Sequence, residues 1–185
     1  KVFGAVLLLT GTGWAGSYSS SARGTSSAEF LKIPVGARTA GMGGAGTVVT
    51  GDPGGLARNT AGMAASEKQQ ILLAHTPSRE GTAASNAYYV RPLDQGAVGV
   101  GVTYFSAGSI DETESTVGAT VGAFHPSDWA ATVGYARTVG GWDLGLAVKG
   151  VQSKIIEADS TVAFDGGILT PKLWGERLRF GASVL

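Results

Sequence analysis

The sequence predicts an all-β protein, an antiparallel transmembrane β-barrel of the outer-membrane type, and three observations lead to that fold class. Apolar residues alternate with small or polar residues along successive segments of about ten residues each. Aromatic residues stand toward the ends of these segments, and a stretch with the anatomy of an export signal precedes them. We expect about seven or eight strands in this chain. A soluble β-sandwich, which shows the same alternation, is the alternative.

The N-terminal residues predict two segments that precede the folded domain. Residues 1–15 begin with Lys1, continue with a short apolar run and end in small residues, as secretory signal peptides do. A membrane anchor is the alternative, although the run is shorter than the ~20 residues that a spanning helix needs. Residues 16–27 are rich in serine and predict a flexible linker.

Residues 28–185 are expected to form the barrel domain, with a plug-like N-terminal segment at 28–64 and the strands at 70–185. The facing is clearest in residues 142–151, where large apolar side chains alternate with Asp143, Gly145, Ala147 and Lys149. The same period of two predicts strands at residues 97–106, 117–124, 129–137, 162–168 and 178–184, whereas 70–76 and 85–90 are less clear in their facing. Turn residues separate these strands at 92–96, 126–128, 139–141 and 171–172.

Glycines dominate the face of the strands that we expect to point into the barrel. Glycine allows another part of the chain to approach the backbone closely, so we expect the N-terminal segment to fold into the lumen against this face. The alternative is that the glycines only relieve curvature in a coiled sheet. The glycines concerned are Gly99, Gly101, Gly118, Gly122, Gly134 and Gly145.

Charged residues on the same face predict a luminal ion-pair network rather than a ligand site, because inward charges are common in barrels. These residues are Asp143, Lys149, Asp165 and Arg179. The cluster of Asp111, Glu112 and Glu114 lies between two predicted strands and is expected to be a solvated loop.

Composition disfavours several function classes. The chain has 30 glycines, only 15% charged residues, no cysteine and two histidines, so a thiolate metal site is excluded and a metalloenzyme is disfavoured. The net charge of zero and the lack of a basic run argue against nucleic acid as a partner. We therefore expect no cofactor and no bound metal.

No motif predicts catalysis or nucleotide binding. The G-x-G-x-x-G string at residues 41–46 follows Pro34 and glycines rather than a buried strand, and a second string lies in the signal peptide. His125, Ser127 and Asp128 are neighbours at a proline turn, where they cannot form a catalytic triad. The sequence thus predicts a protein that is not an enzyme.

One segment carries a family resemblance. Residues 27–45, Ser-Ala-Glu-Phe-Leu-Lys-Ile-Pro-Val-Gly-Ala-Arg-Thr-Ala-Gly-Met-Gly-Gly-Ala, resemble the N-terminal signature of the PorV/PorQ family, outer-membrane proteins related to the FadL fatty-acid transporters. Residues 59–63 resemble the family's Asn-Pro-Ala-Gly-Leu box, with Thr60 in place of proline and with Asn59 and Gly62 kept. Residues 163–169 and 178–184 resemble the middle of the family's barrel. The signature residues are Phe30, Pro34, Gly36, Arg38, Gly41, Met42, Gly43 and Gly44.

The resemblance implies a protein of the bacterial outer membrane, in contact with its lipids. Family barrels have about fourteen strands, so we expect this chain to be the N-terminal half of a barrel, truncated at its C-terminus. The resemblance implies a role in type IX secretion, binding and shuttling secreted proteins together with other secretion components. Two alternatives are a FadL-like channel for hydrophobic small molecules and a structural outer-membrane protein.

Overall fold

The structure is a computed structural model that describes residues 28–78, 81–113, 120–154, 158–174 and 177–185. The predicted signal peptide (1–15) and linker (16–27) lie outside the described residues. Strands dominate the described part of the chain, and all of the strand pairs are antiparallel. The prediction of an antiparallel all-β fold is therefore confirmed.

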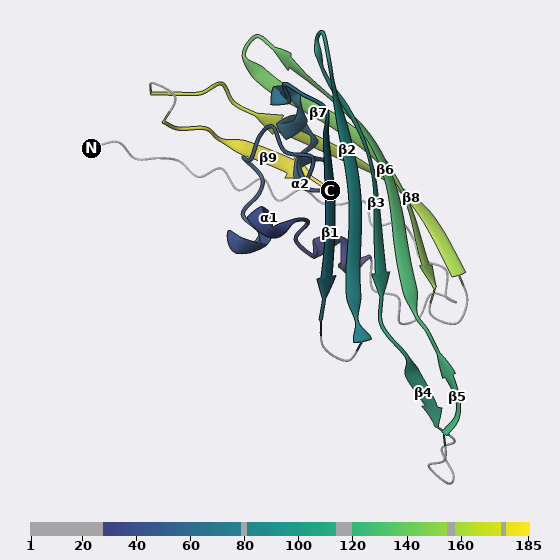
Figure 1. Cartoon of the computed structure of the whole chain (residues 1–185). Helices are drawn as coiled ribbons and strands as arrows, with labels where there is room; N and C mark the ends of the chain where they lie inside the picture. Colours follow the sequence, from purple (N-terminus) through teal and green to yellow (C-terminus); the bar gives the residue numbers. More distant parts are fainter. Residues whose placement is uncertain (1–27, 79–80, 114–119, 155–157, 175–176) are drawn as a thin grey trace.

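Seven strands form one sheet in which each strand pairs with the next strand of that sheet along the chain. β1 and β9 are its two edges, so the described sheet is curved but not closed into a barrel (Figure 1). Two-residue turns help to set its register: between β6 and β7, Gly140 and Gly141 have φ values of 58° and 84°, which glycine adopts without strain. The strands are β1 (Gln70–Pro77), β2 (Ala83–Leu93), β3 (Gly96–Ser106), β6 (Ser127–Val139), β7 (Trp142–Lys154), β8 (Ala158–Leu169) and β9 (Gly181–Val184).

The connection between β3 and β6 differs from the prediction. Residues 117–124 were expected to be a strand of the main sheet, but β5 (Thr120–Phe124) pairs only with β4 (Ile110–Thr113) in a separate two-stranded sheet. In the main sheet β3 pairs directly with β6, and the β4–β5 hairpin projects beyond it (Figure 1). Asp111 and Glu112, expected in a loop, are exposed on β4, where their charges interrupt the apolar alternation. Glu114 and Gly118 lie outside the described residues.

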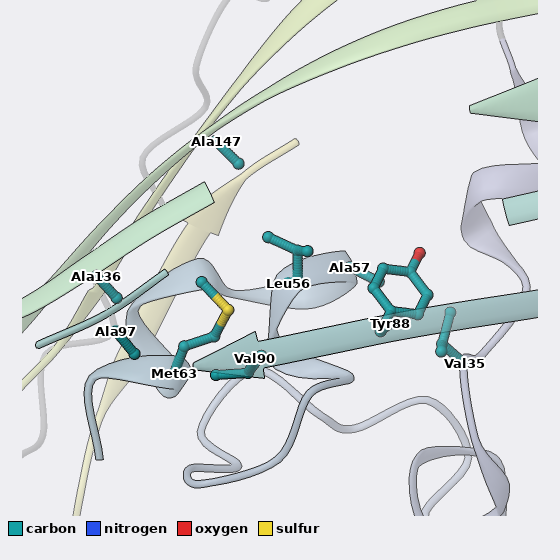
Figure 2. Packing of buried hydrophobic residues seen from close by; sticks show 9 residues of the cluster. All are labelled: Val35, Leu56, Ala57, Met63, Tyr88, Val90, Ala97, Ala136 and Ala147. Carbon is teal, nitrogen blue, oxygen red and sulfur yellow. The ribbon is translucent and has the colours of Figure 1, made fainter. Parts of the chain in front are cut away.

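The N-terminal segment, residues 28–64, packs on the concave face of the sheet (Figure 1). Its turns are short: η1 (Glu29–Lys32), α1 (Ala37–Gly41), α2 (Gly55–Arg58) and η2 (Thr60–Ala65), the last extending one residue past the segment. The segment forms two apolar clusters with the sheet, which hold it in place. The Phe30 cluster consists of Phe30, Ala130 and Val151. The Leu56 cluster, which Figure 2 shows, consists of Val35, Leu56, Ala57, Met63, Tyr88, Val90, Ala97, Ala136 and Ala147.

Candidate functional site

Glycines line the concave face of the sheet, and because they have no side chains the N-terminal segment packs directly against the backbone of the strands. A Cβ atom at Gly99 would lie 2.6 Å from Met63 Sδ, and one at Gly134 would lie 2.5 Å from Leu56 Cδ1. At Gly145 a Cβ would overlap the backbone of residues 60–61. A Cβ at Gly145 would thus meet backbone, which cannot rotate away, whereas at Gly99 and Gly134 the side chains of Met63 and Leu56 would have to shift for the segment to dock. The expected role of glycine is confirmed at these positions.

Two of the other expected glycines face something else. Gly101 receives the ring of Tyr88 from the neighbouring strand, and Gly122 faces Glu112 within the β4–β5 hairpin. The prediction that they make room for the N-terminal segment was wrong. Gly167, which the prediction left out, does make room for it, because a Cβ there would overlap Asn59 Oδ1. Its alternation with Phe164 and Ile168 was the signal that could have identified it.

Asn59 and Gly62 hold the turn that lies on these glycines. Asn59 is buried, its Oδ1 accepts a hydrogen bond from Ala61 N at 3.1 Å, and its Nδ2 donates one to Thr47 O at 2.8 Å. Asn59 therefore caps η2 with its side chain, although Thr60 stands where the resembling family carries proline. A Cβ at Gly62 would overlap the carbonyl oxygen of Val49. Both residues shape the docked segment.

The four predicted inward charges form two separate ion pairs. Lys149 Nζ lies 2.6 Å from Asp165 Oδ2, with side chains 6% and 1% exposed. Arg179 pairs with Asp143, whose Oδ1 also accepts a hydrogen bond from Thr138 Oγ1 at 2.5 Å. All four side chains are largely removed from solvent at the concave face. The predicted ion pairing is present, as two pairs rather than one connected network.

The signature residues divide into an anchored part and an exposed part. Phe30 is buried in the Phe30 cluster, and Pro34, which follows η1, is half-buried. Gly36, with φ 79°, precedes α1, and its Cβ position lies 3.2 Å from Leu72 Cδ1. Beyond this point the signature forms a turn on the surface. Its residues there are Arg38, Gly41, Met42 and Gly43, which are exposed, and Gly44, which is half-buried.

The convex face of the sheet is apolar and is not covered by any described residue. One row of aligned residues crosses six strands with large apolar side chains that point away from the N-terminal segment. The exposed fraction is 73% at Phe164 in this row and 72% at Leu146 elsewhere on the same face, which is unusual for such residues in water. The row consists of Ile71, Tyr89, Val100, Val133, Val148 and Phe164.

Aromatic and polar residues border this apolar band at both ends of the strands. At one end Tyr104 aligns with Trp129, whose Nε1 donates a hydrogen bond to Gln152 Oε1. Toward the other end Tyr135 Oη donates to Gln95 O at 3.0 Å, and Trp142 begins β7. From Trp142 to Gln152, β7 runs about 34 Å at ~3.4 Å per residue. In an outer-membrane barrel whose strands tilt by about 40°, a strand of this length would span about 26 Å, and the apolar band of such barrels is ~25 Å tall.

A cavity of about 10 Å³, lined by Phe30, Tyr88 and Lys149 among others, lies between the N-terminal segment and the sheet and has room for about one water molecule. Among the described residues there is no group of three or more metal-ligating side chains, and no helix is long and apolar enough to cross a membrane.

The chain was also compared with known proteins. No family model matches it, and neither the curated proteins nor the solved structures gave a match.

Proposed function

We propose that the chain forms the wall of an outer-membrane β-barrel of the PorV/PorQ type, with its convex face against lipid and its N-terminal segment inside. The observation that carries this proposal is the uncovered apolar band on the convex face, bordered by aromatic residues. In water such a band is a strong liability for aggregation, whereas lipid is its natural solvent.

A soluble sandwich is the less consistent alternative. A sandwich buries the apolar faces of its sheets against each other, so its second layer should cover the large apolar side chains. In this protein the second layer, the N-terminal segment, lies instead on the glycine-lined face. Large apolar side chains such as Leu73 and Leu146 are 75% and 72% exposed and are not covered by any described part of the chain.

We propose further that the protein acts in type IX secretion as a component that binds and shuttles secreted proteins. The resemblance of residues 27–45 and 59–63 supports this role. The small cavity beneath the segment supports it over the channel alternative, because sites for small molecules usually have about 300–1,000 Å³. Between the N-terminal segment and the sheet the cavity has about 10 Å³. A channel for hydrophobic molecules would need the segment to move aside.

Membrane insertion can be tested with single cysteines, because the chain has none of its own. Leu146→Cys lies on the convex face of β7, and Gln95→Cys lies in the β2–β3 turn as the matched control. In outer membranes we expect a lipid-soluble maleimide to label the first variant and a membrane-impermeant one to label only the second. Labelling of Leu146→Cys by the impermeant reagent would rule out the lipid-facing band.

The secretion role is tested by cross-linking and mass spectrometry on the native protein in its own outer membrane, with an unrelated barrel as control. Secreted proteins captured through their C-terminal domains are the expected result. Recovery of lipids or small hydrophobic molecules alone would favour the transporter instead, while leaving the membrane proposal intact.

A further inference from the structure

The Lys149–Asp165 ion pair lies beneath the N-terminal segment, between its two apolar clusters. On β7, Lys149 stands between Ala147 of the Leu56 cluster and Val151 of the Phe30 cluster, and all three point to the concave face. Lys149 also lines the small cavity, together with Phe30 and Ile33 of the segment. The segment therefore shields the pair from bulk water, and the two side chains are only 6% and 1% exposed.

This buried pair is poorly coordinated. Asp165 Oδ2 lies 2.6 Å from Lys149 Nζ, but among the described residues Oδ1 has no partner and Oδ2 has none besides Lys149. The Arg179–Asp143 pair on the same face differs, since Asp143 accepts from Thr138 and Arg179 Nε donates to Thr170 O at 2.9 Å. An ion pair removed from water is a net stabilising element only when further hydrogen bonds complete its coordination. The carboxylate of the Lys149–Asp165 pair lacks them among the described residues.

We propose that the Lys149–Asp165 pair is a release device for the N-terminal segment. The two apolar clusters favour the docked state, in which the pair loses its hydration. Undocking returns the two charges to water, so the pair shifts the equilibrium toward release. The segment is thus a displaceable cover of the concave face rather than a fixed part of the core. This inference concerns only the segment and the sheet and holds whether or not the protein acts in secretion.

Trypsin reports the docking equilibrium, because the segment contains both a shielded and an exposed cleavage site. Cleavage after Arg58 requires Asn59, which is 1% exposed, to leave the sheet. Arg38 is exposed, and Thr39 after it is buried against Gly46 within the segment, so cleavage after Arg38 needs local opening of α1 but no release from the sheet. The rate of cleavage after Arg58 divided by the rate after Arg38, measured on the purified full-length chain, therefore reports how often the segment leaves the sheet. The division corrects for differences in protease activity.

The decisive variant replaces both charges with apolar residues, Lys149→Met with Asp165→Leu. We expect cleavage after Arg58 to slow by about tenfold or more, with cleavage after Arg38 unchanged, since well-packed apolar replacements of buried pairs are neutral to stabilising. Hydrogen exchange of the β6 and β7 amides is measured alongside, to show that the sheet is intact. Equal or faster cleavage after Arg58 on an intact sheet would overturn the proposal.

Two further variants keep the test decisive. Lys149→Met alone leaves the Asp165 charge without its partner, and we expect faster cleavage after Arg58, because release hydrates the stranded charge. If the double variant fails to fold, an unchanged rate in this single variant refutes the proposal. Arg179→Met with Asp143→Leu is the matched control, since this pair is better coordinated. If cleavage after Arg58 slowed in this control as much as in Lys149→Met with Asp165→Leu, the proposal that the Lys149–Asp165 pair favours release would be contradicted.

Discussion

Two glycines of β7 allow the contact between the N-terminal segment and the sheet to be measured with one identical substitution. Gly145 faces the segment, and a Cβ there would overlap the backbone of residues 60–61, which cannot rotate away. Gly150 lies on the convex face, and a Cβ there meets nothing within 4 Å. Gly145→Ala and Gly150→Ala therefore add the same methyl group to the same strand, with and without a steric conflict.

The structure sets bounds on the cost of Gly145→Ala. A small shift of η2 that relieves the overlap costs about 1–3 kcal/mol, as overpacking in cores does. Release of α2 and η2 alone, with the Phe30 cluster still in place, would expose Leu56 and Met63, both 0% exposed, at about 1.5–3 kcal/mol each. We therefore expect a loss of about 2 kcal/mol or more, with a ceiling near 6 kcal/mol. For Gly150→Ala we expect a change within about 0.5 kcal/mol.

Equilibrium unfolding in denaturant, followed by tryptophan fluorescence in detergent or lipid, measures both free energies. The rate of tryptic cleavage after Arg58 should rise in Gly145→Ala and stay unchanged in Gly150→Ala. Equal destabilisation by the two substitutions, or none by Gly145→Ala, would refute the argument that glycine at the concave face serves to seat the segment.

Further substitutions test the cap, the core and the convex face. Asn59→Ala removes the hydrogen bond to Thr47 O and the cap of η2, so we expect the free energy of unfolding to fall by about 1–2 kcal/mol and hydrogen exchange in η2 to speed up. Met63→Ala leaves a cavity in the Leu56 cluster and should cost about 2–5 kcal/mol in the same unfolding assay. Leu146→Arg should weaken insertion into lipid vesicles by about 2–4 kcal/mol, whereas Gln152→Arg at the edge of the band should change it by about 1 kcal/mol or less; equal effects would contradict a membrane-embedded band.

The facing of the strands could be predicted from the sequence because the strand period is two and the two faces carry different residues. In β7 the predicted outward residues Trp142, Leu144, Leu146 and Val148 are all exposed, and the residues between them are buried. The residues between them are buried because the N-terminal segment covers only the concave face of the sheet. Had both faces been apolar, the alternation would have vanished and the facing could not have been predicted.

The partners of individual side chains could not be predicted, because they depend on where distant segments meet. The sequence places Lys149 and Asp165 on one face, but only the register that sets Lys149 opposite Ala163 and Asp165 opposite Ala147 brings the charges together. The β4–β5 hairpin was missed for a related reason. Its pattern has the strand period, and the period does not say which sheet a strand joins.

The order of the strands has a consequence for how the protein folds. Neighbours in the sheet are successive hairpins, apart from the step that spans β4 and β5, so most of the sheet forms from contacts that are short in sequence. The turn at Asn59 lies against Gly167, more than a hundred residues away, and touches β7 and β8 as well as β3 and β6. The surface against which this turn packs is therefore complete only when β8 has joined the sheet. This turn therefore docks only after most strands of the main sheet have formed, and the folding chain carries it undocked through most of the assembly of the sheet.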